Sequence, residues 1–156
     1  RTKEEIEALE AAHTKEPSAR HLQRTLASDV TERVHSKGDV DFAIKAADVL
    51  FGKATIETLR SLSAALLVSI FKDVPCKDIS RDALVKGIPV IELFTTHSGF
   101  VESKGKAHDL IKQSGLSLNK EKVTDKALVV GASALLADRY LLLSRGKKDY
   151  FLVRVA

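Results

Sequence analysis

The residues best suited to chemistry in this sequence are basic side chains that recur at intervals of four. Lys104, His108 and Lys112 follow one another at this spacing, with Ser103 just before them and Lys106 within the same stretch. In an α-helix, residues four apart share one face, and the unpaired N–H groups at a helix N-terminus attract phosphate. A helix through these residues is therefore predicted to present a cationic face that binds a polyanion.

Two further basic segments follow this predicted helix. One is a polar turn after a short apolar run, and the other is the tip between two apolar, β-prone runs near the C-terminus. Their candidate polyanion-binding residues are Asn119, Lys120, Lys122, Arg145, Lys147 and Lys148. Each segment alone is more often an ordinary solvated turn than a ligand site, so the prediction depends on the convergence of three basic elements.

The elements that must position these side chains change type along the chain. Apolar residues recur at helical spacing through the first half, whereas short alternating or continuous apolar runs predominate near the end. The helices expected in the first half cover residues 4–10, 18–38, 40–51 and 55–71. The predicted fold class is α+β, with a helical segment followed by a small α+β module that ends in a β-hairpin.

The expected domain organisation has a boundary near the middle of the chain. Residues 1–74 are predicted to form a helical segment and residues 88–156 the α+β module. Between them, residues 75–87 have the Pro, Cys, Asp and Ser composition of a linker.

The distribution of charge supports a polyanion-binding surface in the second module. The 156 residues carry a net charge of +4, yet residues 1–52 hold 8 Lys and Arg against 10 Asp and Glu. Residues 99–156 hold 11 Lys and Arg against 6 Asp and Glu, a net charge of +5. Clustered cations on one part of a folded chain are typical of nucleic-acid binding.

Several other classes of protein are excluded or disfavoured by composition and spacing. With 44% hydrophobic and 29% charged residues, the chain is expected to fold, and it contains no apolar run long enough to cross a bilayer. Its single cysteine cannot form an internal disulfide, and its histidines lack metal-ligand spacing, so no metal site is predicted. Because it lacks methionine and begins with an acidic segment, we expect a piece of a longer protein.

A resemblance to a known family becomes specific over residues 103–123. Their sequence, SKGKAHDLIKQSGLSLNKEKV, is similar to the SKSEARRLIxxGGVxVNxxKV pattern of the αL RNA-binding fold. Residues 140–155 resemble the closing hairpin of that fold in bacterial-type tyrosyl-tRNA synthetases. Residues 4–10 and 47–51 are similar to the helical region that precedes it. The chain therefore resembles the C-terminal, tRNA-binding region of such an enzyme.

Where the sequence departs from this pattern, it resembles mitochondrial members more than bacterial ones. His108 replaces an arginine, Gly105 and Lys106 replace a Ser-Glu pair, and Ser114 replaces a glycine. The resemblance thus implies a location in the mitochondrial matrix, with the bacterial cytoplasm as the alternative.

The resemblance also implies a function for the fragment and for its parent. The fragment would position tRNA(Tyr) through its anticodon stem and variable arm without catalysing ligation, since it lacks the family's catalytic motifs. The fragment would be a monomer that binds no cofactor and no membrane. The parent would be a homodimer that uses ATP and Mg²⁺. Two alternatives remain: the same surface could bind structured group I intron RNA as a splicing cofactor, or the chain could be a protein-interaction module.

Overall fold

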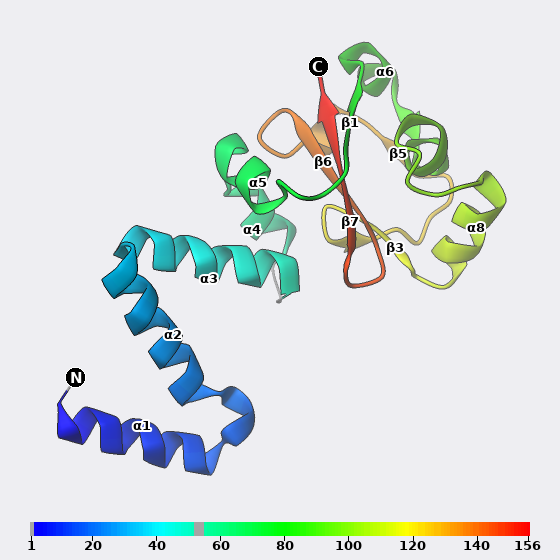
Figure 1. Ribbon diagram of the computed structural model, residues 1–156. Coiled ribbons are helices and arrows are strands. Elements are labelled where there is room, and N and C mark those ends of the chain that lie inside the picture. The colour runs from blue at the N-terminus through cyan, green and yellow to red at the C-terminus, as the bar shows by residue number, and fades with distance from the viewer. Residues whose placement is uncertain (1, 52–54) are drawn as a thin grey trace. The chain divides into compact units, whose positions relative to one another are not determined.

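The computed structural model describes residues 2–51 and 55–156, which divide into two compact units, Arg1–Ala46 and Ala47–Ala156. Helices come first and most strands last, so the predicted α+β fold class is confirmed (Figure 1). In chain order the elements are α1 (Lys3–Lys15), η1 (Pro17–Ala19), α2 (His21–Val34), α3 (Lys37–Phe51), α4 (Ile56–Arg60), α5 (Ala64–Ile70), β1 (Cys76–Ile79), α6 (Arg81–Lys86), β2 (Ile88–Pro89), α7 (Val90–Glu92), η2 (Leu93–His97), α8 (Lys104–Lys112), β3 (Leu116–Leu118), β4 (Glu121–Lys122), β5 (Val129–Val130), η3 (Ala132–Ala134), β6 (Tyr140–Arg145) and β7 (Asp149–Val155).

The first unit consists of helices with little buried surface. Helix α1 begins with a capping box, in which Thr2 Oγ1 accepts a hydrogen bond from Glu5 N at 3.3 Å. In return, Thr2 N donates to Glu5 Oε2 at 3.0 Å, so two backbone donors at the helix start are satisfied. Helices α1 and α2 contact each other, but neither contains a buried residue among those described.

The second unit is built on a mixed sheet of five strands in the order β1-β7-β6-β3-β4. Strands β6 and β7 form the predicted antiparallel hairpin, with Arg145 opposite Asp149 beside the turn. Strand β1 joins the other edge of β7 in parallel, and the two run side by side in Figure 1 as green and red ribbons. A separate antiparallel pair consists of β2 and β5.

The structure differs from the sequence-based expectation of a linker over residues 75–87. Strand β1 pairs with β7 from Cys76 opposite Leu152 to Ile79 opposite Val155, and helix α6 follows at once. The side chain of Leu84 in α6 is fully buried. Burying a leucine contributes about 1.5–3 kcal/mol to folding, so this segment is an integral part of the second unit.

The helix expected over residues 55–71 is also interrupted. The stretch over 55–71 divides into α4 and α5, because Ser63 caps a new helix with its Oγ accepting from Leu66 N at 3.2 Å. After Pro89, helix α7 has a single turn and continues as the π-helical turn η2.

Helix α8 and the sheet share one hydrophobic core. Ala107 and Ile111 are the buried residues of α8, and they pack in the cluster that includes Leu116 of β3 and Leu143 of β6. This core also holds residues of β1, α6, α7 and η2. It therefore fixes α8 beside the sheet whose turns carry the other basic residues.

Candidate nucleic-acid interface

Helix α8 forms as predicted, and Ser103 caps its first turn. The Oγ of Ser103 accepts a hydrogen bond from Lys106 N at 3.2 Å, which satisfies one of the free donors of the first turn. Lys104 and Lys112 are exposed, whereas His108 is half-buried. The helix thus presents its lysines to solvent while Ala107 and Ile111 fill the core.

Two of the lysines at the start of α8 are already paired with carboxylates. Lys104 Nζ lies 2.7 Å from Glu92 Oε1, and Lys106 Nζ lies 2.8 Å from Glu102 Oε2. These hydrogen bonds, strengthened by the lysine charges, lower the pKa of both glutamates. A phosphate would therefore compete with a carboxylate for either ammonium group.

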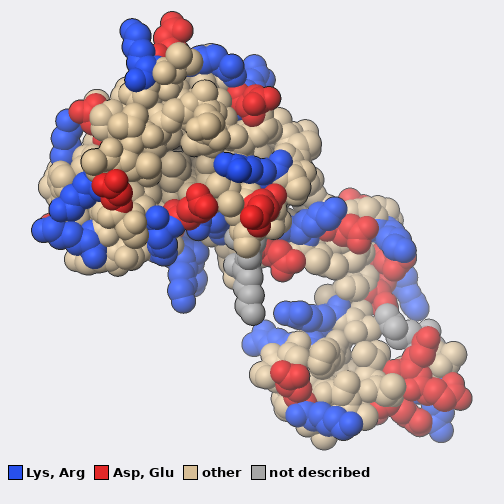
Figure 2. All heavy atoms as spheres, turned by 180° about the vertical axis from the view of Figure 1, so that it is seen from behind, with Lys and Arg blue, Asp and Glu red and all other residues tan. Residues whose placement is uncertain are grey.

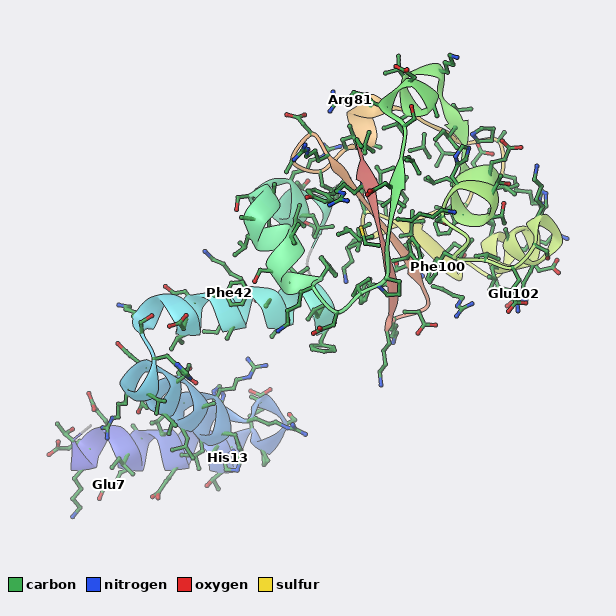
Figure 3. The ribbon with its side chains drawn as sticks, turned by 45° about the horizontal axis from the view of Figure 1, so that its top comes forward. Glu7, His13, Phe42, Arg81, Phe100 and Glu102 are labelled. Atoms are coloured by element: carbon green, nitrogen blue, oxygen red, sulfur yellow. The ribbon has the colours of Figure 1, made fainter. Side chains whose placement is uncertain are left out.

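Arg145, at the end of β6, is likewise paired. Its guanidinium Nη2 lies 3.2 Å from Asp149 Oδ2 and its Cζ lies 5.4 Å from the ring centroid of Phe100. Phe100 and Glu102, labelled in Figure 3, belong to the segment that leads into α8. Arg145 therefore helps to connect the hairpin to this segment. On the face in Figure 2, acidic side chains lie among basic ones.

Asn119 is buried in the structure, whereas the sequence predicted that it contacts the ligand. With Lys120 it forms the two-residue turn between β3 and β4, where both have positive φ, 50° and 71°. Such turns favour asparagine. The side chain is 2% exposed: its Nδ2 donates to Ala134 O at 2.6 Å, and its Oδ1 accepts from Leu142 N at 2.9 Å. Both ends of the amide are therefore used inside the fold.

Lys120 in this turn and Lys122 in β4 both make hydrogen bonds through their ammonium groups. Lys120 Nζ donates a hydrogen bond to the hydroxyl of Tyr150 and lies 4.5 Å from the centroid of its ring. Lys122 Nζ donates to Ser114 O at 2.7 Å, at the end of α8. Neither lysine is paired with a carboxylate among the described residues, so an anion would not have to displace one.

The turn and the hairpin tip come together in one open groove of about 430 Å³, which we call the lysine groove. Its lining, within residues 2–51 and 55–156, contains three lysines and no Asp or Glu. The lining residues are Leu50, Phe51, Ser117, Lys120, Lys122, Ser144, Gly146, Lys147 and Tyr150. Two of the three predicted basic elements therefore converge.

The end of α8 lies next to the lysine groove. Gly146 N donates to Gly115 O at 2.8 Å, so the hairpin tip is fastened to the residue that follows α8. Gly146 has a φ of 67°, a conformation that glycine adopts without strain. Lys112 in the last turn of α8 and Lys148 at the tip are exposed, and they make no ion pair with another described residue. The paired lysines at the start of α8 do not line this groove.

Sequence reasoning missed the aromatic residues of the site. Tyr150 follows the basic tip, and its hydroxyl donates to Leu50 O at 2.9 Å while its ring lies 5.7 Å from that of Phe71. Phe51 ends α3 and is 79% exposed. An aromatic residue next to a basic turn is a signal of nucleic-acid binding that the sequence contains at Tyr150, whereas nothing local marks Phe51.

Metal binding and membrane crossing can also be judged for the described part of the chain. Within it, no three His, Cys, Asp or Glu side chains are grouped so that they could hold a metal ion. None of its described helices combines the length and the apolar character needed to cross a membrane.

Comparison with known proteins identifies the family. The model of the tyrosine–tRNA ligase SYY-like C-terminal domain matches residues 67–153. Tyrosine–tRNA ligases of Bacteroides thetaiotaomicron and Cytophaga hutchinsonii are 46% and 44% identical to the chain over 97% and 98% of its length, and that of Porphyromonas gingivalis is 41% identical over 97%. The matches cover 35%, 36% and 35% of these proteins, so the chain spans about a third of the length of its curated relatives. With the SYY-like match extending over more than half of its residues, the chain belongs to the family of tyrosine–tRNA ligase C-terminal domains.

Proposed function

We propose that this chain is the RNA-binding region of a tyrosine–tRNA ligase and that it positions tRNA(Tyr) for aminoacylation elsewhere in the protein. The observation that carries this proposal is the lysine groove, where Lys120, Lys122 and Lys147 from two separate turns surround a cavity without a carboxylate in its described lining. Phosphate oxygens are the ligands that such a cluster of ammonium groups attracts.

The proposed mode of binding is recognition of RNA shape. Contacts from lysines to phosphates fix the position of a nucleic acid without reading its bases. The exposed Lys112 and Lys148 extend the charge of the lysine groove toward α8 and across the hairpin tip. We propose that this surface follows the backbone of the anticodon stem and the long variable arm, whose geometry differs from that of other RNAs.

The proposal assigns the chemistry of ligation to the remaining two thirds of the ligase. ATP and Mg²⁺ would act there, and homodimerisation would also depend on that part, while the present chain would bind RNA as a monomer. The relatives compared are bacterial, which favours a bacterial cytoplasm over the mitochondrial location that the sequence suggested.

Binding of the purified chain to a tRNA(Tyr) transcript tests this function. We expect affinity to fall with salt, with a slope of about 0.7–0.9 in log–log units for each phosphate contacted. A tRNA of equal length with a short variable arm is the matched control, and we expect it to bind more weakly. Equal affinity for both tRNAs would contradict recognition of the variable arm.

A second arm of the experiment addresses the alternative RNA. A group I intron transcript is added as a competitor against labelled tRNA(Tyr). Displacement at equal concentration would favour the splicing alternative, while failure to displace would support tRNA(Tyr) as the partner. If neither RNA bound the chain, the proposed function would be wrong.

A further inference from the structure

The lysine groove combines ammonium groups with an exposed aromatic ring, and this combination suits one kind of ligand. We infer that the groove holds a single unpaired nucleotide of the bound RNA, with its base stacked on Phe51 and its phosphates at Lys122 and Lys147. This inference rests on the proposed function and specifies which part of an RNA enters the groove.

Phe51 is the residue that distinguishes a base-binding site from a purely electrostatic one. Among the described residues it is the only aromatic side chain that is largely exposed, with 79% of its surface open. The other large apolar residues exposed in the second unit are Val68, Val85, Leu128 and Val129. Proteins that bind unpaired nucleotides use such rings as stacking platforms, because every base has a π face.

The backbone next to Phe51 is held in place by the hairpin. The Tyr150 hydroxyl donates to the carbonyl of Leu50, the residue before Phe51, at 2.9 Å. The ring of Tyr150 packs against Phe71, which is buried, and Lys120 Nζ contacts the same hydroxyl. The end of α3 is therefore attached to β7, so that the backbone that carries Phe51 is held at the groove before any ligand binds.

The charge of the groove selects an anion. Lys122 is directed by its hydrogen bond to Ser114 O, and Lys147 lies at the hairpin tip without an ion pair to another described residue. The floor between them includes Ser117 and Ser144, which pair across β3 and β6 and are small. Phosphates flanking a nucleotide would place negative charge beside these lysines while the base reaches the ring.

The size of the groove favours a nucleotide over a duplex. Its volume of about 430 Å³ lies within the range of small-molecule sites. A duplex would offer phosphates to the lysines, but its stacked bases could not reach Phe51. An acidic peptide would pair with the lysines but would leave the aromatic ring without a specific partner. A nucleotide would contact both the lysines and the ring, so it matches the groove better.

The test compares two labelled hexamers that differ only in their bases. One is hexaadenylate, and the other is a hexamer of 1-deoxyribose phosphates with the same charge and 2′-hydroxyls. We expect the full chain to bind hexaadenylate about tenfold more tightly. Phe51→Leu should bring this ratio close to one, whereas Phe51→Tyr, which keeps an aromatic face, should preserve it.

The lysine variants give the complementary result. Lys122→Gln and Lys147→Gln should weaken the binding of both hexamers by the same factor, because phosphates are common to both probes. Lys86→Gln, an exposed lysine on α6 outside the groove, is the matched control and should leave both affinities unchanged. Unchanged thermal unfolding temperatures would show that every variant is folded.

Three outcomes would overturn the inference. These are equal affinity of the parent chain for both hexamers, an unchanged base preference in Phe51→Leu, and displacement of hexaadenylate by a polyglutamate peptide of equal charge. If any of them occurred while tRNA(Tyr) still bound with a steep salt dependence, the nucleotide site would be wrong and the proposed function would stand. Loss of tRNA binding in the parent chain would refute both.

Discussion

A single buried amide holds the β3–β4 turn to two other parts of the second unit. Asn119 bonds to the carbonyl of Ala134 and to the N–H of Leu142, and its backbone has a positive φ. We expect Asn119→Ala to lower the free energy of unfolding by about 1–3 kcal/mol, because a buried donor and acceptor lose their partners. Urea denaturation measures this loss.

Two matched variants separate the causes of the Asn119 effect. Asn119→Gly loses the same hydrogen bonds but tolerates the left-handed backbone, so it should be more stable than Asn119→Ala. Asn119→Asp keeps the acceptor for Leu142 N but turns a buried carboxylate oxygen toward Ala134 O, so it should not recover the lost stability. Equal stability of the alanine variant and the parent would contradict the role assigned to this amide.

Basic residues that form ion pairs with carboxylates are expected to contribute less to RNA binding than unpaired ones. Lys147→Gln is expected to lower the slope of log affinity against log salt by about 0.7–0.9, since one phosphate contact is lost. The double variant Lys104→Gln, Glu92→Gln removes a neutral pair and should change tRNA affinity by less than about twofold. Fluorescence anisotropy at several salt concentrations compares them. A larger loss in the double variant would place the RNA on the first turn of α8.

At the scale of elements, the Asp78–Arg154 pair joins β1 to β7. Arg154 Nε lies 2.6 Å from Asp78 Oδ1, and this hydrogen bond lowers the pKa of the aspartate. A lowered pKa means that the pair stabilises the fold above the ordinary aspartate pKa of about 3.9 and ceases to do so as pH falls through the lowered value. Asp78→Asn should therefore reduce the thermal unfolding temperature at pH 7, and the difference from the parent should disappear in acid.

The double-mutant cycle provides the control for this pair. Arg154→Gln should lower the unfolding temperature at pH 7 as well, and the combined variant should be less destabilised than the sum of the single changes. Additive effects at pH 7 would show that the two side chains do not interact.

Local signals explain which elements could be predicted from the sequence. Helix α8 has a serine cap and a buried stripe, and the β6–β7 hairpin has two apolar runs around a basic tip, so both were predicted correctly. Strand β1 has no such signal: only Ile79 of its residues is buried, and its partner β7 lies 76 residues farther along the chain. A parallel pairing at that distance leaves no pattern in the neighbouring sequence.

The same reasoning explains the candidate site. The sequence marks Lys120, Lys122 and Lys147 as candidates because each lies in or beside a polar turn, and their contacts with RNA stay predictions. The ion pairs of Lys104, Lys106 and Arg145 could not be weighed from the sequence, because both members of a pair must be placed first. Phe51 lies at the groove next to Leu50, whose carbonyl accepts a hydrogen bond from Tyr150, 100 residues away in the sequence. Local sequence does not reveal such a contact.

At the scale of the whole molecule, the two units should differ in local stability. Strands β6 and β7 lie inside the sheet, and most of their residues are buried, whereas α1 and α2 contain no buried residue among those described. We expect amide hydrogens of β6 and β7 to exchange slowest and those of α1 and α2 to exchange fast, as followed by mass spectrometry. Residues 76–79 should be protected together with β7. Fast exchange at residues 76–79 would instead support the linker that the sequence predicted.

The position of β7 also has a consequence for synthesis of the protein. Strand β7 follows the other strands of the sheet in the sequence and lies between β1 and β6. Beyond it, Ala156 N donates to Ile79 O and Arg81 N donates to Ala156 O, so Ala156 is bonded on either side of Ser80. Until these residues leave the ribosome, β1 has no strand beside it and β6 has a single neighbour, β3. The sheet therefore closes only after β7 has been synthesised, and a chain without β7 would leave the facing edges of β1 and β6 unpaired.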